Sequence, residues 1–128
     1  MTQKRILVID DDEIFRTGLV GILQMEGYSV LEAKDGEEGL AVFKEENPDL
    51  VITDILMPKK EGIETIIEIL DEQSGQAIIA MSGGGKGNPR EYLGFAENFG
   101  ARQILQKPFR IPELLAAIES LMNGSADA

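Results

Sequence analysis

The strongest constraint on the fold is an alternation between short apolar runs and longer segments of helical periodicity. The apolar runs are rich in Ile, Leu and Val. Several of them lack a regular polar alternation, which is typical of strands buried on both faces of a sheet. They predict five strands, at residues 4–9, 28–33, 49–53, 76–81 and 102–106.

Segments of helical periodicity fill the intervals between these strands. Apolar stripes at helical spacing predict helices over 13–26, 62–72 and 111–122, and Gly27 is a typical stop signal for the first of them. Strands that alternate with helices pair in parallel through right-handed crossovers. Five strands alternating with five helices therefore predict an α/β fold, with a five-stranded parallel sheet in a doubly wound three-layer sandwich.

Length and composition favour one domain over residues 1–128, with a core from about 4 to 122 and a frayed tail over 123–128. No apolar stretch approaches the ~20 residues of a membrane span. The sequence "MTQKR" runs directly into a predicted strand, which argues against a signal peptide. The lack of cysteine fits a cytoplasmic protein, and the lack of histidine excludes imidazole chemistry.

The charge balance limits the expected partners. Twelve basic and 23 acidic residues give a formal net charge of -11. A surface this negative repels nucleic acid and anionic lipid, so we expect no direct binding to nucleic acid or to a membrane. Proteins are the expected partners, and a local cluster of acids would attract a cation.

Polar and charged side chains stand at the carboxyl ends of the predicted strands, the edge at which open α/β sheets bind ligands. They are Asp10, Asp11, Asp54, Ser82 and Lys107. Carboxylates with no arginine or histidine nearby indicate a hard divalent cation such as Mg²⁺. A cation, a lysine and a hydroxyl around one carboxylate form a set suited to phosphoryl transfer, in which that carboxylate is the nucleophile.

Each of these residues also has a purely structural interpretation. The acidic run from Asp10 to Glu13 could simply begin the first helix, where negative charge is favoured by roughly 0.3–1 kcal/mol. Asp54 could cap a turn, Ser82 could be a loop hydroxyl, and Lys107 could be an exposed charge. The convergence of the whole set on one edge of the sheet favours the chemical interpretation.

Four motifs resemble those of receiver domains of two-component response regulators, in the same order and at similar spacing: "ILVIDDDE", "VITDILMPKKEG", "AMSGG" and "LQKPF". The resemblance covers residues 4 to 122 and implies a flavodoxin-like sheet with strand order 2-1-3-4-5. It implies that Asp54 accepts a phosphoryl group from the phosphohistidine of a histidine kinase or a phosphotransfer protein. Such a domain catalyses only its own phosphorylation and dephosphorylation, so we do not expect an enzyme that acts on other substrates.

The resemblance also implies a set of ligands for Mg²⁺ (or Mn²⁺). Asp11 would bind the ion directly, and Asp10 would act largely through water. Asp54 and the backbone carbonyl of Leu56 would complete the protein ligands. Asp12 and Glu13 have no metal role by this matching and would begin the first helix.

Further roles follow for the residues after the fourth and fifth strands. Ser82 would be the switch hydroxyl, and the amide of Gly83 would meet the phosphoryl group. Lys107 would pair with that group, and Pro108 follows it where the family commonly has a cis peptide bond. Ile104 occupies the position at which the family often has an aromatic ring that turns inward on activation, so the usual coupling of hydroxyl to ring is in doubt.

Signalling would run through the face formed by helix 4, strand 5 and helix 5, which would bind a downstream protein target. Candidate residues on that face are Tyr92, Phe95, Ile104, Gln106 and Arg110. We expect no output domain in this chain, which is then either a stand-alone receiver or a piece of a longer regulator or hybrid kinase. The polar ending "NGSADA" favours the stand-alone interpretation.

Two other functions remain open at this point. A phosphatase of the haloacid dehalogenase type would use Asp10 as the nucleophile, in an Asp-x-Asp pair with Asp12, but it would leave Asp54 without a role. A degenerate receiver would bind a partner without being phosphorylated, although all the key side chains are present.

Overall fold

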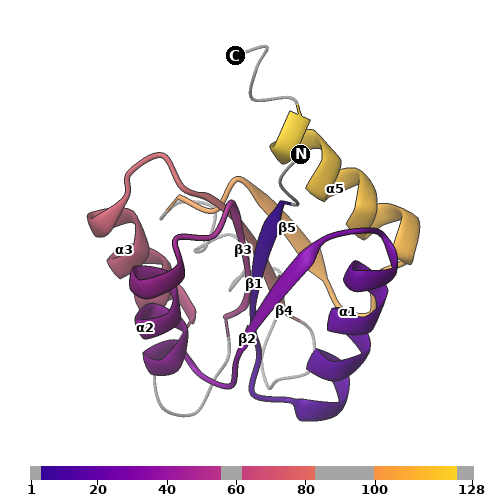
Figure 1. Ribbon diagram of the computed structural model, residues 1–128, viewed down its shortest axis with the longest axis horizontal. Coiled ribbons are helices and arrows are strands. Elements are labelled where there is room, and N and C mark those ends of the chain that lie inside the picture. Colours follow the sequence, from indigo (N-terminus) through magenta and orange to yellow (C-terminus); the bar gives the residue numbers. More distant parts are fainter. Residues whose placement is uncertain (1–3, 56–61, 83–99, 124–128) are drawn as a thin grey trace.

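The computed structural model describes residues 4–55, 62–82 and 100–123. Strands and helices alternate through the first two of these ranges (Figure 1). The elements are β1 (Arg5–Ile9), α1 (Glu13–Met25), β2 (Ser29–Ala33), α2 (Gly36–Glu46), β3 (Leu50–Asp54), α3 (Gly62–Glu72), β4 (Ala77–Ser82), β5 (Gln103–Gln106) and α5 (Ile111–Asn123).

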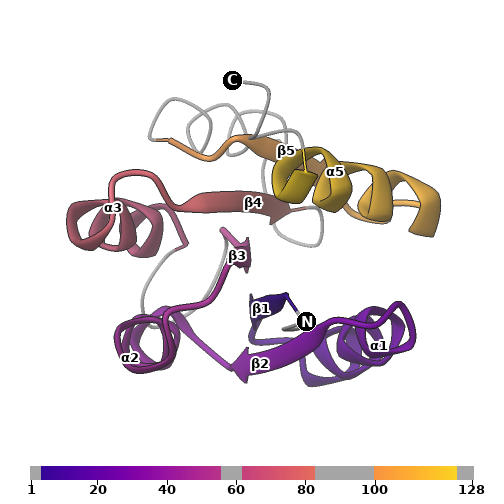
Figure 2. The same ribbon diagram turned by 45° about the horizontal axis from the view of Figure 1, so that its top comes forward.

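The five strands form one parallel sheet in the order β2-β1-β3-β4-β5. Helices α1 and α5 cover one face of the sheet, and α2 and α3 cover the other (Figure 2). The predicted α/β sandwich and its strand order are therefore confirmed. A further helix between β4 and β5, which the alternating pattern requires, would fall at 83–99, outside the described residues.

Two apolar clusters, one on each face of the sheet, form the core. Successive strand residues point to opposite faces, so a strand covered on both sides must be apolar at every position. In β1, for example, Leu7 and Ile9 pack toward α2 and α3, while Ile6 and Val8 pack toward α1 and α5. Double coverage of this kind explains why the strand runs in the sequence lack a polar alternation.

Capping residues set the bounds of α1. The side chain of Asp12 accepts a hydrogen bond from the Phe15 amide at 3.1 Å and so begins the helix. The helix ends at Met25, and Gly27 then adopts a left-handed backbone with φ +95°. Because L side chains rarely adopt that conformation, the predicted stop at Gly27 is confirmed.

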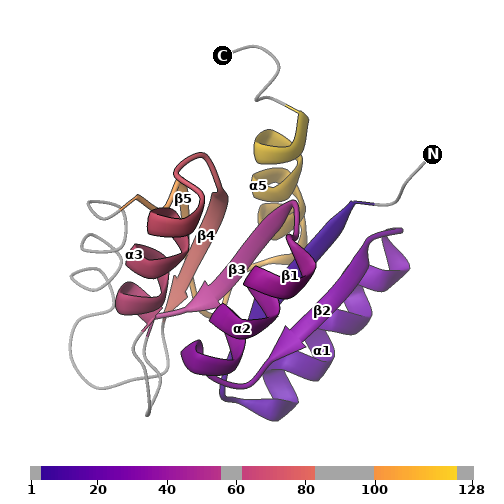
Figure 3. The ribbon, with the colours of Figure 1, turned by 60° about the vertical axis from the view of Figure 1, so that its left-hand side comes forward.

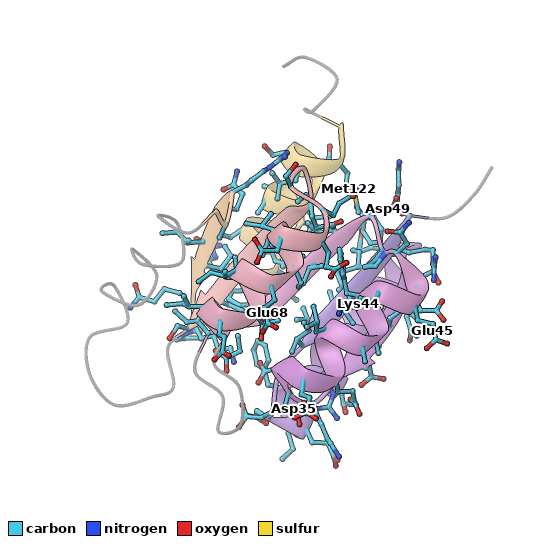
Figure 4. The ribbon with its side chains drawn as sticks, turned by 90° about the vertical axis from the view of Figure 1, so that its left-hand side faces the viewer. Asp35, Lys44, Glu45, Asp49, Glu68 and Met122 are labelled. Carbon is cyan, nitrogen blue, oxygen red and sulfur yellow. The ribbon has the colours of Figure 1, made fainter. Side chains whose placement is uncertain are left out.

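The direction of the strands brings all five carboxyl ends to one edge of the sheet, as the arrows of the ribbon show (Figure 3). Asp35, which caps the start of α2, lies toward this edge. Asp49 and Met122 lie at the opposite end of the molecule (Figure 4). The residues that the sequence singled out for chemistry should therefore meet at the end of the sheet that carries Asp35.

Candidate functional site

Three carboxylates converge at the carboxyl edge of the sheet. Asp10 follows β1 and is fully buried, while Asp54 is the buried last residue of the neighbouring strand β3. Asp11 follows Asp10 and is exposed. One ligand oxygen from each of the three lies within 4.8 Å of the others, close enough for one cation to contact all of them. The sequence-based grouping of these acids agrees with their position in the structure.

Lys107 reaches this cluster from the end of β5. Its Nζ lies 2.7 Å from Oδ2 of Asp10 and 3.7 Å from Oδ2 of Asp54, and its side chain is only 15% exposed. The ammonium therefore lies between the two buried carboxylates and offsets their repulsion. The peptide bond between Lys107 and Pro108 is cis, as the resemblance to receivers led us to expect.

A network of hydrogen bonds fixes Asp10 in place. Its Oδ1 accepts from the backbone amide of Asp12 at 2.9 Å, and its carbonyl oxygen accepts from Nη1 of Arg16 at 2.7 Å. The Nε of Arg16 in turn pairs with Glu32 on β2 at 3.0 Å. The expectation that no arginine lies nearby was wrong, because one turn of α1 brings Arg16 back over the end of β1. Its guanidinium bonds to a carbonyl and to Glu32 in the contacts described, so it leaves the carboxylates of the cluster available to a cation.

The acidic run divides at the start of α1. Asp12 is the N-cap of this helix, and Glu13 lies in its first turn. Negative charge at both positions is favoured by the positive end of the helix. The structural interpretation therefore applies to Asp12 and Glu13, as predicted, while Asp10 and Asp11 belong to the carboxylate cluster.

The donor set fits a hard divalent cation. It consists of carboxylate oxygens, which Mg²⁺ and Mn²⁺ prefer. Both oxygens of Asp10 already accept hydrogen bonds, from the Asp12 amide and from Lys107, whereas Asp11 is exposed to solvent. This arrangement fits an ion that is bound directly by Asp11 and Asp54 and is contacted by Asp10 through water.

Ser82 ends β4, the strand next to Asp54, and is fully buried. Its Oγ makes no hydrogen bond to any residue that the structure describes. Its carbonyl oxygen accepts a hydrogen bond of 2.7 Å from the Lys107 amide. A buried hydroxyl is stabilised by a partner, so the side chain of Ser82 is available to an additional acceptor near the cluster.

Gly62 is a residue of this site to which the sequence had suggested no role. A Cβ at this position would lie 2.1 Å from the carbonyl oxygen of Asp54 and 2.4 Å from the Cα of Ile55. The Gly62 amide also donates to the Ile55 carbonyl at 3.1 Å. Glycine therefore allows the start of α3 to rest directly on the backbone of Asp54. A signal was present, because Gly62 ends the motif "VITDILMPKKEG" immediately before an apolar helical stripe.

The other predicted residues are only partly covered by the structure. Ile104 lies on β5 and is 37% exposed, and Gln106 and Arg110 are also exposed. These positions leave their side chains accessible to a partner. The predictions made for Leu56, Gly83, Tyr92 and Phe95 lie outside the described residues.

Among the described residues, no helix has the length and apolar character that crossing a bilayer requires.

Comparisons with known proteins agree with this geometry. A family model, the response regulator receiver domain, matches residues 6–119. The chemotaxis protein CheY of Halobacterium salinarum is 36% identical over 121 residues, which cover 94% of this chain and 98% of that protein. A CheY-like receiver domain protein of Methanospirillum hungatei has a similar structure, with a TM-score of 0.88 and 32% identity. The similarity covers 99% of this chain and 100% of that one.

Longer proteins match over the same region. The transcriptional regulatory protein CpxR of Klebsiella pneumoniae is 36% identical over 121 residues, which cover 94% of this chain but 50% of that protein. The chain thus spans about half the length of several curated relatives that it matches.

Proposed function

The chain belongs to the response regulator receiver domain family of two-component systems, and we propose that Asp54 is its phosphoacceptor. Receiver domains of this family interact with histidine kinases and with downstream targets. The donor to Asp54 would be the phosphohistidine of a cytoplasmic histidine kinase or phosphotransfer protein. The chain would act on itself, as the site of its own phosphorylation and dephosphorylation, and not on other substrates.

The proposed reaction is an in-line displacement at phosphorus. A carboxylate oxygen of Asp54 forms a bond to phosphorus as the phosphorus–nitrogen bond breaks, and the imidazole nitrogen of the donor leaves with that electron pair. The product is an acyl phosphate on Asp54. Attack by water on phosphorus would later release inorganic phosphate and restore the carboxylate.

The residues around Asp54 supply the electrostatic conditions for this reaction. The ammonium of Lys107, 3.7 Å from the carboxylate, would stabilise the negative charge of the transferring oxygens. Asp11, Asp54 and, through water, Asp10 would hold Mg²⁺ (or Mn²⁺), with the carbonyl of Leu56 as a further ligand by likeness to the family. The ion, when bound, would supply positive charge that offsets the charge on the same oxygens.

Ser82 supports a switch function. Its buried hydroxyl has no hydrogen bond to the described residues, and it stands on the strand next to Asp54. An oxygen of the new phosphoryl group would accept its hydrogen bond, with the Gly83 amide as a second donor. The resulting shift would reach the face that includes β5, where Ile104 is exposed, and α5. A downstream protein would bind there.

The observation that carries the proposal is the position of the Lys107 ammonium between the carboxylates of Asp10 and Asp54. To test it, the protein is incubated with acetyl phosphate and Mg²⁺, and the adduct is located by peptide mass spectrometry. We expect one phosphoryl group on Asp54, and none in Asp54→Asn or in the presence of a chelator.

The same experiment separates the alternatives. An adduct on Asp10 would favour the haloacid dehalogenase type of phosphatase and overturn the assignment. Absence of any adduct, together with absence of Mg²⁺ binding by calorimetry, would favour a receiver that binds partners without phosphorylation.

A further inference from the structure

The Lys107 ammonium has a third neighbour besides the two carboxylates. It lies 4.0 Å from the centroid of the Phe15 ring, over the face of that ring. Its contacts with Asp10 and Asp54 are ionic, at 2.7 and 3.7 Å, whereas its contact with the ring is a cation–π contact. At 4.0 Å the ammonium is well within the range of about 6 Å at which a cation is attracted to an aromatic face.

We propose that Phe15 is a positioning residue that holds Lys107 at the phosphoacceptor. This inference rests on the proposed function, since it assigns a role in the reaction at Asp54. The ring would keep the ammonium within reach of Asp54 when a bound cation weakens the attraction between Lys107 and Asp10.

Phe15 is held in place by contacts of its backbone and of its ring. Its amide donates to the side chain of Asp12 at the start of α1. Its ring packs edge-on against Phe109, with centroids 5.8 Å apart and planes at 88°. Phe109 follows Lys107 by two positions, so the backbone that carries the ammonium also carries the ring that orients Phe15. Phe15 on α1 therefore contacts two side chains of the segment after β5, Lys107 and Phe109.

A ring face suits this task better than another carboxylate would. It attracts the ammonium without neutralising the charge that the phosphoryl oxygens need. It also occupies space that water would otherwise fill around a side chain that is 15% exposed. A cation bound at the cluster would offset part of the negative charge of Asp10, and this would weaken the attraction between Asp10 and Lys107. The contact with Phe15 does not depend on that carboxylate and persists.

Phe15 differs from the buried residues of the core. It is only partly buried and lines an open apolar groove of about 220 Å³ between α1 and α5. Ile22 and Ile111 line the same groove without an aromatic face to offer a cation. Tyrosine keeps an aromatic face at this position and differs from phenylalanine by one hydroxyl. Phe15→Tyr therefore preserves the ring, whereas Phe15→Leu removes it.

The first measurement is structural and needs no phosphorylation. In protein labelled with ¹³C at the lysine ε-carbons, the ring current of Phe15 should shift the Lys107 ε-methylene protons upfield. Phe15→Leu should abolish this shift and Phe15→Tyr should retain it. Ile22→Leu is the control, because Ile22 lines the same groove but has no ring, and this variant should leave the shift unchanged. A wild-type spectrum without the shift would overturn the inference.

The second measurement is the rate of Asp54 phosphorylation by acetyl phosphate at saturating Mg²⁺. From the usual strength of a cation–ring contact, Phe15→Leu should lower the maximal rate roughly 3- to 30-fold, with Phe15→Tyr near the wild-type rate. The Mg²⁺ affinity, measured by calorimetry, should not change. Equal rates for wild type and Phe15→Leu, or equal losses for the leucine and tyrosine variants, would overturn the positioning role.

Failure of this inference and failure of the proposed function look different. A wild-type protein that is phosphorylated, with Phe15→Leu equally active, overturns the role of Phe15 alone. A wild-type protein that shows the ring-current shift but accepts no phosphoryl group overturns the proposed function, although the contact between the two side chains stands.

Discussion

The ammonium of Lys107 lies 2.7 Å from Oδ2 of Asp10, although 97 positions separate the two residues in the chain. Asp10 is fully buried, and this contact joins its carboxylate to the residue that follows the edge strand β5. Removal of a partner leaves a buried charge uncompensated, which costs more free energy than the pair contributes when both are present. The first prediction follows from this asymmetry.

Lys107→Met should lower the free energy of unfolding by roughly 1–3 kcal/mol, because it leaves two buried carboxylates in mutual repulsion. It should also abolish measurable phosphorylation of Asp54. Urea unfolding followed by circular dichroism measures the first effect. Lys44→Met is the control, because Lys44 pairs with Glu72 at 3.6 Å with both side chains about half exposed. That variant should change the stability by less than about 0.5 kcal/mol, and an equal loss in both would contradict the prediction.

Asp11→Asn and Glu13→Gln each remove one exposed acidic charge near the start of α1, but only the first belongs to the carboxylate cluster. Asp11→Asn should weaken Mg²⁺ binding about tenfold or more, because it removes a charged ligand. Glu13→Gln should leave Mg²⁺ affinity unchanged and cost a few tenths of a kcal/mol in helix stability. Isothermal titration calorimetry compares the two. If they weakened binding alike, the division of the acidic run would be wrong.

Gly62→Ala should destabilise the fold by roughly 2–3 kcal/mol, because the new methyl group overlaps the backbone of Asp54 and Ile55. It should also slow phosphorylation, since the displaced backbone carries the phosphoacceptor. Gly21→Ala is the matched control within α1, where a Cβ meets nothing within 4 Å. That change should stabilise the helix by up to about 1 kcal/mol. Similar effects of the two substitutions would show that α3 does not rest on the Asp54 backbone.

Tyr28 gives a prediction for alkaline pH. Partial burial, followed by the nearby charges of Glu119 and Glu26, raises its pKa above the usual 10.0. The folded state therefore favours the neutral phenol. The resulting stability is present below pH 10 and is lost as the pH rises through the raised pKa. In a Tyr92→Phe background, ultraviolet absorbance should titrate Tyr28 above pH 10. Tyr28→Phe should remove this part of the alkaline loss of stability, and a midpoint at or below 10 would refute the prediction.

Much of the fold followed from pattern alone. The strand predicted at 49–53 is β3 (Leu50–Asp54), and the helix predicted at 62–72 is α3 with the same bounds. β3 is a continuous apolar run because both of its faces are buried, and α3 has an apolar stripe because one of its faces is buried. Helix α2 had no such signal. It packs so close to β1 that a Cβ at Gly39 would lie 2.4 Å from Ile9, and small residues of this kind weaken the apolar stripe.

The candidate site was predictable in its charged members but not in its supports. Asp10, Asp54 and Lys107 could be grouped because each stands where a strand ends. The contacts of Arg16 and Phe15 depend on how far α1 turns before it passes the end of β1. The contact of Gly62 depends on the path of α3 over β3. These are properties of packing in three dimensions, and no spacing within one segment records them.

The hydrogen bond from the Lys107 amide to the Ser82 carbonyl, at 2.7 Å, joins the tips of β4 and β5. The side chains of Ser82 and Lys107, which would both contact a phosphoryl group, therefore stand on backbones that are hydrogen-bonded to each other. If the tip of β4 moves toward Asp54, the backbone of Lys107 should move with it. The Ser82 hydroxyl and the Lys107 ammonium would then shift together relative to Asp54. A single displacement of one strand pair, small in amplitude, would then set both contacts at once.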